Sequence, residues 1–401
     1  MIEICIIGLG YVGLPLALNI SKKFKTIGFD INKKRINNLK KKYDDNFEFE
    51  KKDFINKKIF FTNKIDNIRN CNYYIICVPT PIDKKNNPEL SALKKTFDIL
   101  KSVIKKKDTI ILESTVYPGV TNQFSIFLEK NTKLKNNKDF FICYSPERIN
   151  PGDNSKKLNN IDKIFSTKIN NKEKIIEIKK IYSLVSKKLI FSKSIQESEA
   201  AKVIENIQRD LNIALFNEIL MICDKLKLNF SEVIRLASTK WNFLKFNPGL
   251  VGGHCLPVDP YYLSYVSRKN NLNLRTTLAG RATNNLMKNY VLDKFKKHIK
   301  SNHLTNKSKI LVIGITYKYG VSDMRNSLNF EIFKKIKTKY PKTLSYDPFI
   351  EMKSNLTKAP NFKKIDACLF LSKGVKFKKI YSSMIYEKKK IIDPFKYYLK
   401  N

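Results

Sequence analysis

The feature that most constrains the fold of this chain is a glycine-rich turn at residues 8–13, which follows an apolar run at residues 2–7. The turn reads Gly-Leu-Gly-Tyr-Val-Gly and leads into the helix-favouring stretch 14–18. Glycines at these spacings permit a tight turn, let the backbone approach a pyrophosphate, and allow close packing of helix on strand. We therefore expect a dinucleotide-binding α/β domain with three glycines against the cofactor: Gly8, Gly10 and Gly13.

An acidic residue ends the next apolar run. Residues 26–29 lead to Asp30, about 20 residues beyond the turn, where a carboxylate can bind the ribose hydroxyls of the cofactor. An acid at this place favours NAD over NADP. Arg35 leaves NADP open, because a nearby arginine can hold a 2′-phosphate.

Three further apolar runs end in polar residues, at Thr80, Thr115 and Glu147. In an open parallel sheet, ligands bind at the carboxyl ends of the strands, so we expect these side chains to line one crevice. Each of them alone is equally consistent with an ordinary turn or cap residue. Their shared position after a strand is what favours a role in binding.

A long helix is predicted in the middle of the chain. Ser194 and Glu197 have the spacing of a capping box, and neither Gly nor Pro interrupts the chain up to Leu226. Apolar residues at 204, 207, 211 and 214 form a stripe that should pack against a neighbour.

Another face of this helix carries Lys202, Asn206 and Arg209, which are spaced at i, i+4 and i+7. A polar face of this kind is usually solvated. Beside a thiol and a phosphate-binding crevice it has a second interpretation. An ammonium and an amide can stabilise an oxyanion, and a guanidinium can bind a phosphate or carboxylate.

Cys255 lies in the glycine-rich loop 248–260, with Asp259 four residues later. Free cysteine is often a small buried hydrophobe, and we interpret the other six cysteines in that way. Cys255 differs because no apolar periodicity surrounds it, so it is a candidate nucleophile. His254 could lower the pKa of the thiol, although a structural hydrogen-bonding role is favoured. There is no C-x-x-C pair, so we expect reduced thiols and no metal site.

The last third of the chain again alternates apolar runs, at 309–317, 343–346, 366–371 and 390–392, with helical stretches. Its first turn, 314–318, lacks the three-glycine pattern, so a dinucleotide should not bind there. The predicted fold class is therefore α/β, with two doubly wound Rossmann-like domains joined by a long central helix and a helical middle domain.

The formal net charge of +41 would ordinarily suggest nucleic acid as a partner. Only nine of the 77 basic residues are arginines, and the lysines are spread along the whole chain instead of forming a patch. We expect no nucleic acid partner. The apolar runs are too short to span a membrane and the first residues lack a basic leader, so we expect a cytoplasmic protein.

Several motifs, in order along nearly the whole chain, resemble the UDP-sugar 6-dehydrogenase family. They lie at residues 8–17, 113–119, 145–152, 199–206, 248–260 and 318–325. Ser-Pro-Glu-Arg-Ile-Asn-Pro-Gly at 145–152 and Gly-Gly-His-Cys at 252–255 are most similar to the branch that acts on UDP-N-acetylglucosamine or UDP-N-acetylgalactosamine, the Vi-antigen type.

The resemblance implies an NAD-dependent, four-electron oxidation of the sugar C6 alcohol to a carboxylate, in the synthesis of surface polysaccharide or lipopolysaccharide. Cys255 would capture the intermediate aldehyde as a thiohemiacetal and then carry a thioester. Lys202 and Asn206 would stabilise the oxyanion. Asp259 and Thr115 would position or activate water, and Glu147 would assist thioester hydrolysis.

The resemblance also implies two sets of binding residues. Those expected to contact the cofactor, besides the glycines, are Tyr11, Val12, Asp30, Arg35, Thr80, Thr115 and Arg325. Those expected to contact the UDP-sugar are Arg148, Ile149, Lys202, Asn206, Arg209, Gly249, Gly252, Tyr317 and Lys318.

The family further implies a homodimer and three domains. These are an NAD-binding domain at 1–190, a helical dimerisation domain at 194–300 that carries Lys202 and Cys255, and a UDP-binding domain at 305–401. The chain departs from the family pattern at Pro151, where UDP-glucose dehydrogenases have a second carboxylate. It departs again at Leu256-Pro257, where the branch commonly has Ile-Gly.

Alternative functions remain open from the sequence. UDP-glucose or UDP-N-acetylmannosamine could be the substrate. A two-electron β-hydroxyacid dehydrogenase would share the first domain and the Lys-Asn helix but would not require Cys255. A basic nucleic-acid-binding protein on an inactive scaffold is suggested only by the charge.

Overall fold

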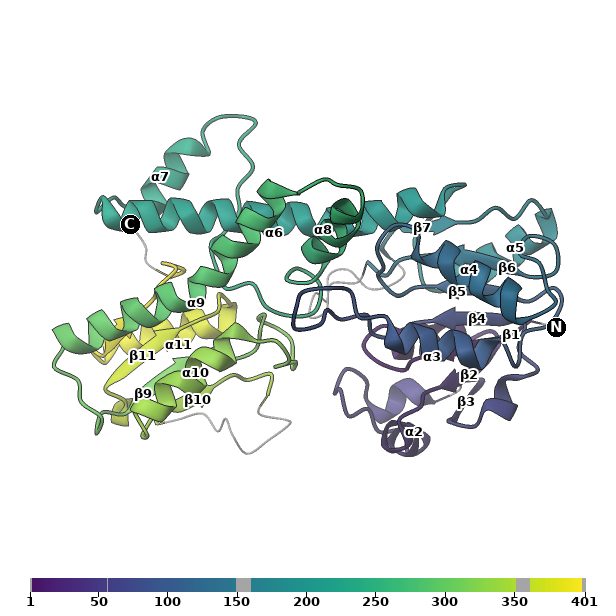
Figure 1. Ribbon diagram of the computed structural model, residues 1–401. Helices are drawn as coiled ribbons and strands as arrows, with labels where there is room; N and C mark the ends of the chain where they lie inside the picture. Colours follow the sequence, from purple (N-terminus) through teal and green to yellow (C-terminus); the bar gives the residue numbers. More distant parts are fainter. Residues whose placement is uncertain (1, 56, 149–159, 351–360, 399–401) are drawn as a thin grey trace. The chain divides into compact units, whose positions relative to one another are not determined.

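The computed structural model describes residues 2–55, 57–148, 160–350 and 361–398 (Figure 1). The chain forms two compact units. The first contains residues 1–205 and 261–272, and the second contains residues 206–260 and 273–401.

The first unit is built on an eight-stranded sheet with the order β3-β2-β1-β4-β5-β6-β7-β8. All neighbouring strands are parallel except β6 and β7, which are antiparallel. The chain runs outward from β1 to β3 and then restarts beside β1 at β4, which is the doubly wound arrangement. The strands are β1 (Glu3–Ile7), β2 (Lys25–Phe29), β3 (Ile59–Thr62), β4 (Tyr73–Ile76), β5 (Thr109–Leu112), β6 (Phe141–Tyr144), β7 (Lys163–Ser166) and β8 (Leu189–Ser192).

The central strands are buried on both faces, and helices cover both sides of this sheet. Ile4 and Ile6 of β1 belong to a buried cluster with apolar residues of three helices, α1, α2 and α5. The intervening residues, Cys5 and Ile7, are buried as well, as expected for a parallel sheet covered on both sides. The helices of this unit include α1 (Gly13–Ile20), α2 (Lys33–Lys40), α3 (Ser91–Leu100), α4 (Val120–Asn131) and α5 (Lys172–Tyr182).

The second unit contains a four-stranded parallel sheet with the order β10-β9-β11-β12. Ile310 and Val312 of β9 pack in one buried cluster with α9 and α10, whereas Leu311 and Ile313 pack in another with α11. This sheet is therefore also covered on both faces. The strands are β9 (Ile310–Ile313), β10 (Leu344–Tyr346), β11 (Ala367–Phe370) and β12 (Lys390–Ile392), shown in green to yellow in Figure 1.

The predicted long helix is α6 (Ile195–Lys225), with 31 residues. The hydroxyl of Ser194 accepts a hydrogen bond from the Glu197 backbone N–H at 3.3 Å, which confirms the predicted helix start. One prediction about its apolar stripe was wrong, because Ile204 is half exposed whereas Ile207 and Ala214 are buried. The remaining helices are α7 (Phe230–Ala237), α8 (Asp259–Lys269), α9 (Arg275–Ser301), α10 (Leu328–Lys339) and α11 (Val375–Tyr386).

The observed sheets confirm the predicted fold class of two Rossmann-like α/β sheets with a long central helix. Among the described helices, none is long and apolar enough to cross a membrane. The described ranges also contain no group of three His, Cys, Asp or Glu side chains that could hold a metal ion.

Candidate active site and nucleotide sites

The first glycine turn requires glycine at two positions for steric reasons. Gly8 has a φ of +90°, and a Cβ atom there would lie 2.9 Å from the Cys77 carbonyl oxygen. A Cβ atom on Gly13 would lie 1.8 Å from the Gly8 carbonyl oxygen. Gly10 differs, because a Cβ atom there would meet no atom within 4 Å. The turn is thus tightly closed on the sheet side and open at Gly10.

Helix α1 begins directly after this turn, at Gly13. Its N-cap residue, Val12, provides no side-chain hydrogen bond to the first turn of the helix. Free N–H groups and the positive end of the helix dipole favour a phosphate at such a terminus. The turn and helix therefore fit the pyrophosphate of a dinucleotide.

Asp30 and Arg35 are held in place by the same turn. Asp30 accepts hydrogen bonds from the backbone N–H of Leu9 at 2.9 Å and of Asn32 at 2.8 Å. Arg35 is buried; its Nε donates to the Leu9 carbonyl at 2.9 Å, and its Nη1 lies 2.7 Å from a carboxylate oxygen of Asp44. Because this guanidinium is already paired with an acid, it is poorly placed to hold a 2′-phosphate. The structure thus supports NAD over NADP.

Thr80 and Thr115 are brought together after strands β4 and β5, as the sequence predicted. The Thr80 hydroxyl donates to the Thr115 carbonyl at 2.7 Å. The hydroxyl of Tyr262, on α8, donates to the Thr80 carbonyl. These contacts fix two polar loops at the carboxyl edge of the sheet.

Glu147, the third residue of the predicted crevice, belongs to a buried ionic cluster. One of its carboxylate oxygens lies 3.2 Å from the Nζ of Lys163, and the same ammonium lies 2.6 Å from Glu113. The Tyr182 hydroxyl donates to Glu113 at 2.7 Å. We call Glu113, Glu147, Lys163 and Tyr182 the acid cluster. Its lysine was not predicted from the sequence, since a single charged residue at the start of a short strand gives no recognisable signal.

Polar side chains of helix α6 before residue 206 have different environments. Glu199 is buried and accepts hydrogen bonds from the Gly119 N–H at 2.5 Å and the Thr121 N–H at 2.9 Å, which caps α4. Glu205 forms an ion pair with Arg148. Lys202 is only 7% exposed, and its ammonium forms no hydrogen bond or ion pair with the described residues of its own unit. A desolvated ammonium is suited to an anionic ligand or oxyanion.

The structure brings Asn206 and Asp259 together, a contact that was not predicted from the sequence. The Asn206 amide Nδ2 lies 2.5 Å from the Asp259 Oδ2. Asp259 is buried and begins α8, and its backbone N–H donates to the Cys255 carbonyl at 2.9 Å. Cys255 is exposed. The loop thus places an accessible thiol one turn before a buried carboxylate that an amide on α6 orients.

His254 faces acidic and amide groups of the second unit. Its Nε2 lies 3.8 Å from a carboxylate oxygen of Asp323, and its Nδ1 lies 3.4 Å from the Asn326 amide. Burial, and then the nearby Arg325, lower the pKa of His254 below its usual value. The imidazole is therefore neutral near pH 7. These contacts support the favoured structural role.

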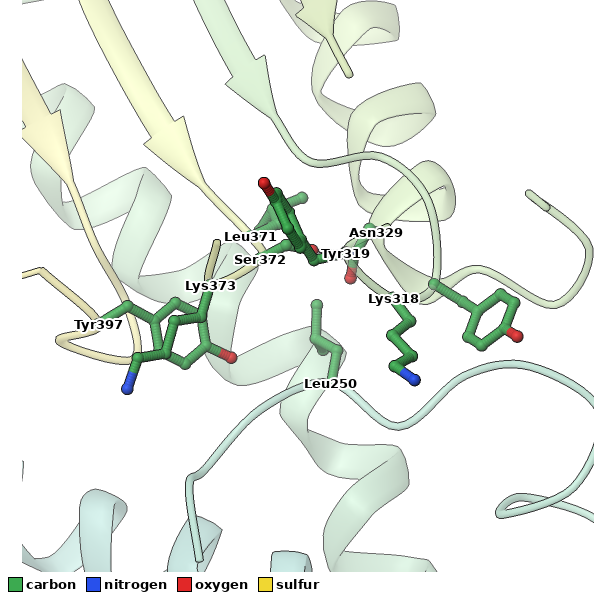
Figure 2. A pocket seen from close by; sticks show the side chains of 9 residues that line it. Leu250, Lys318, Tyr319, Asn329, Leu371, Ser372, Lys373 and Tyr397 are labelled. Atoms are coloured by element: carbon green, nitrogen blue, oxygen red, sulfur yellow. Dashed lines mark hydrogen bonds between the residues drawn. The ribbon is translucent and has the colours of Figure 1, made fainter. Parts of the chain in front are cut away.

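The second unit has a cavity of about 370 Å³ at the carboxyl ends of β9 and β11 (Figure 2). Chain order reverses between these two strands, and ligands bind at such a switch point in open α/β sheets. Figure 2 shows the Lys318 and Lys373 ammonium groups and the Tyr397 ring around the cavity. The lining residues are Leu250, Tyr317, Lys318, Tyr319, Asn329, Leu371, Ser372, Lys373 and Tyr397.

The cysteine loop packs closely on this cavity. The Gly249 N–H donates to the Asn217 side chain at 2.8 Å, and a Cβ atom on Gly249 would lie 2.7 Å from the Tyr397 hydroxyl. A Cβ atom on Gly252 would lie 2.6 Å from the Asn326 carbonyl oxygen. These glycines let the loop approach the turn that carries Tyr317 and Lys318.

The other predicted site residues have less defined environments. Arg209 is exposed on α6. Arg325 lies in the second unit, where its guanidinium pairs with Asp323 at 2.8 Å, so its predicted cofactor contact stays a prediction. Ile149 and Pro151 lie outside the described residues.

Two of the cavity residues could have been found by the rule that identified Thr80. Ser372 and Lys373 follow the apolar run 366–371, just as Thr80 follows its own run. Tyr397 could not, since it reaches the cavity from the far end of the chain. A nucleotide turn in one unit and a switch-point cavity in the other are typical of an enzyme that uses a dinucleotide cofactor and a second phosphorylated ligand.

Comparison with known proteins agrees with this geometry. The NAD-binding domain of the UDP-glucose/GDP-mannose dehydrogenase family matches residues 2–186, and the central domain of that family matches residues 196–286. A UDP-N-acetyl-D-glucosamine 6-dehydrogenase from Salmonella typhi is 42% identical over 354 residues, which cover 87% of this chain and 83% of the relative. One from Pseudomonas aeruginosa is 38% identical, with 87% and 83% covered.

A solved structure shows the same fold. The UDP-N-acetyl-mannosamine dehydrogenase Cap5O from Staphylococcus aureus is 28% identical and superposes with a TM-score of 0.83, covering 100% of this chain and 96% of that one. The chain belongs to the UDP-glucose/GDP-mannose dehydrogenase family. It is an NAD-dependent oxidoreductase that acts on a nucleotide sugar.

Proposed function

We propose that this enzyme oxidises the C6 alcohol of a UDP-N-acetylhexosamine, UDP-GlcNAc or UDP-GalNAc, to the carboxylate. The relatives at 42% and 38% identity are named as UDP-N-acetyl-D-glucosamine 6-dehydrogenases, which supports this substrate class. The overall reaction consumes one sugar alcohol, two NAD and one water, and it yields the carboxylate, two NADH and three protons. Bound NAD accepts the hydride in each oxidation.

The observation that carries the proposal is the pairing of Asn206 with Asp259 next to an accessible Cys255. In the proposed mechanism, the Cys255 sulfur adds to the C6 aldehyde to form a thiohemiacetal. Loss of a second hydride gives a thioester, and a thiol suits both steps because it adds readily to carbonyls and later departs. Lys202 and Asn206 stabilise the oxyanion, and Asp259 and Thr115 position water.

Hydrolysis completes the reaction. Water gives one proton to a base as it adds to the thioester carbonyl, the carbon–sulfur bond breaks, and the sulfur leaves as a thiolate that takes up a proton. We assign that base to Glu147, whose carboxylate is held at the end of β6.

The cavity of the second unit is the proposed UDP site. Its volume of about 370 Å³ and its two lysines suit a nucleoside diphosphate, since ammonium groups neutralise phosphate charge. We retain a division into an NAD-binding domain (1–190), a helical domain (194–300) and a UDP-binding domain (305–401) as part of the proposal.

We also propose that the enzyme is a homodimer in the cytoplasm, serving surface-polysaccharide synthesis. Several large apolar side chains on and after α6 and α7 are exposed, and exposed apolar surface of this kind commonly marks a protein interface. They are Leu215, Ile222, Leu236, Trp241 and Leu244.

A second substrate is favoured by one observation. Two solved structures of UDP-N-acetylmannosamine dehydrogenases superpose on this chain with TM-scores of 0.84 and 0.83. Comparing kcat/KM for UDP-GlcNAc, UDP-GalNAc, UDP-ManNAc and UDP-glucose separates these possibilities. The proposal requires one of the first two to be the best substrate.

The variant Cys255→Ser tests the thioester mechanism. We expect its turnover to fall by at least about 10³-fold, because serine is a much weaker nucleophile without an adjacent base to activate it. Steady-state NADH production measures the effect, and Cys223→Ser, on a buried cysteine of the same unit, is the control. Wild-type turnover in Cys255→Ser contradicts the mechanism.

A further inference from the structure

The acid cluster contains a buried lysine, Lys163, that forms ion pairs with two glutamates. The side chain of Lys163 is 2% exposed, and its ammonium lies 2.6 Å from Glu113 and 3.2 Å from Glu147. It begins β7, whereas the two glutamates follow β5 and β6. Three neighbouring strands therefore deliver three charged groups to one point at the edge of the sheet.

The two glutamates differ in what they can do. Glu113 is fully buried, and both of its oxygens are engaged, one by Lys163 and one by the Tyr182 hydroxyl at 2.7 Å. Glu147 lies nearer the surface, and its second oxygen accepts from the Arg148 N–H at 2.6 Å. Lys163 therefore links Glu147, the proposed base, to the fully buried Glu113.

The charges of the cluster do not cancel. Burial acts to lower the pKa of Lys163, but attraction to Glu113 and Glu147 outweighs it and raises that pKa, so the ammonium stays charged. Burial raises the pKa of Glu113, which Lys163 opposes. Burial also keeps the Tyr182 hydroxyl and the neighbouring Cys77 thiol neutral by raising the pKa of each. One ammonium therefore compensates the charge of two carboxylates. Removing the ammonium would leave a buried carboxylate without its partner, which is strongly unfavourable.

From this geometry we propose that Lys163 is a positioning residue for thioester hydrolysis, which orients the Glu147 carboxylate to take a proton from water. The inference deepens the proposed function and rests on it. In the step concerned, water adds to the thioester carbonyl, Glu147 receives one water proton, the carbon–sulfur bond breaks, and Cys255 is released. Lys163 touches neither substrate nor water in this account and acts through Glu147 alone.

The test follows the covalent adduct on Cys255. The reaction is run as a single turnover with UDP-GlcNAc and NAD, and the mass of the intact protein in quenched samples is measured by mass spectrometry. We expect Lys163→Met to form the thioester at the wild-type rate and to hydrolyse it about 10²-fold more slowly, because general-base assistance is typically worth that much. The adduct therefore accumulates in Lys163→Met and stays transient in the wild type.

The pH profile of hydrolysis distinguishes positioning from a merely structural role. Lys163→Met removes a positive charge next to Glu147. The acidic limb, the pH range in which the hydrolysis rate falls as the pH is lowered, should therefore move toward higher pH in this variant. Glu113→Gln removes a negative charge instead, and its acidic limb moves toward lower pH. Lys163→Arg keeps the charge and should stay close to the wild type. The double variant, Lys163→Met with Glu113→Gln, removes a neutral pair and should hydrolyse faster than Lys163→Met alone.

The outcomes separate this inference from the function on which it rests. A wild-type enzyme that reduces no NAD with any UDP-sugar contradicts the proposed function. A wild type that reduces two NAD per sugar, while Lys163→Met hydrolyses its adduct at the wild-type rate with an unmoved pH profile, contradicts the role of Lys163 alone. If Lys163→Met does not fold, the opposite pH shift of Glu113→Gln and the charge rescue in Lys163→Arg decide the question, and an unchanged profile in Glu113→Gln contradicts the inference.

Discussion

At the scale of single residues, the glycines of the first turn differ in what a Cβ atom would contact. Gly13 lacks a Cβ because the Gly8 carbonyl occupies its place, whereas Gly10 faces open space. The same motif therefore contains two glycines that the fold needs, Gly8 and Gly13, and one, Gly10, that only a close ligand would need.

Substitution of Gly13 should affect mainly stability, whereas substitution of Gly10 should affect mainly NAD binding. Gly13→Ala should lower the free energy of unfolding by about 1–3 kcal/mol, since overpacking strains the turn. Gly10→Ala should change that free energy by less than about 0.5 kcal/mol. We expect it nevertheless to weaken NAD binding at least tenfold, as measured by calorimetry, because its methyl group occupies the space of the pyrophosphate. Unchanged NAD affinity in Gly10→Ala would show that the pyrophosphate lies elsewhere.

Single residues were predictable where a strand end or a glycine pattern marked them. Asp30, Thr80 and Thr115 follow apolar runs, and the structure places each at the carboxyl edge of the first sheet. Lys163 pairs with Glu113, 50 residues away, and Arg148 pairs with Glu205, 57 residues away. No local sequence pattern predicts such pairs.

At the scale of elements, α6 stabilises a neighbouring helix through a side chain. Glu199 receives hydrogen bonds from the backbone N–H groups of Gly119 and Thr121 and from the Thr121 hydroxyl. A carboxylate at the N-terminus of α4 satisfies donors that the helix cannot satisfy itself, and it interacts favourably with the helix dipole.

Glu199→Ala should lower the free energy of unfolding by about 2–4 kcal/mol, because it leaves buried donors unpaired. Glu197→Ala removes an exposed acid on the same helical turn, and we expect an effect below about 0.5 kcal/mol. Urea unfolding of the two variants provides the comparison. Equal stabilities would contradict the capping role.

Elements with strong periodicity were predicted well, and short ones were not. Helix α6 begins and ends within a residue or so of its predicted bounds, since a capping box and an uninterrupted run define it. Strands β3, β7 and β8 were not predicted, because each is a short segment that begins or ends with a polar side chain. Hydrophobic patterning cannot distinguish such segments from loops.

At the scale of the whole molecule, the second unit exposes apolar surface that a monomer would not need. Trp241 is 91% exposed, and Leu244 nearby is 68% exposed. Association of two chains through this region would remove that surface from water, with a free-energy gain roughly proportional to the apolar area buried.

Trp241→Ser combined with Leu244→Ser should therefore weaken the proposed homodimer. We expect sedimentation equilibrium to give a dimer mass for the wild type and a dimer dissociation constant at least about tenfold higher for the double variant, since losing two apolar anchors costs more than 1.4 kcal/mol. Tyr386→Ser, on the equally exposed surface of α11, is the control and should leave the mass unchanged. A monomeric wild type would contradict the proposed dimer.

The central claim is a four-electron oxidation through Cys255, and its most direct test is the stoichiometry of the reaction. The wild-type enzyme is incubated with limiting UDP-GlcNAc, or UDP-GalNAc if it is the better substrate, and excess NAD, and the NADH formed is divided by the sugar consumed. We predict two NADH per sugar with the uronic acid as product. One NADH per sugar, with an aldehyde as the final product, would contradict the account.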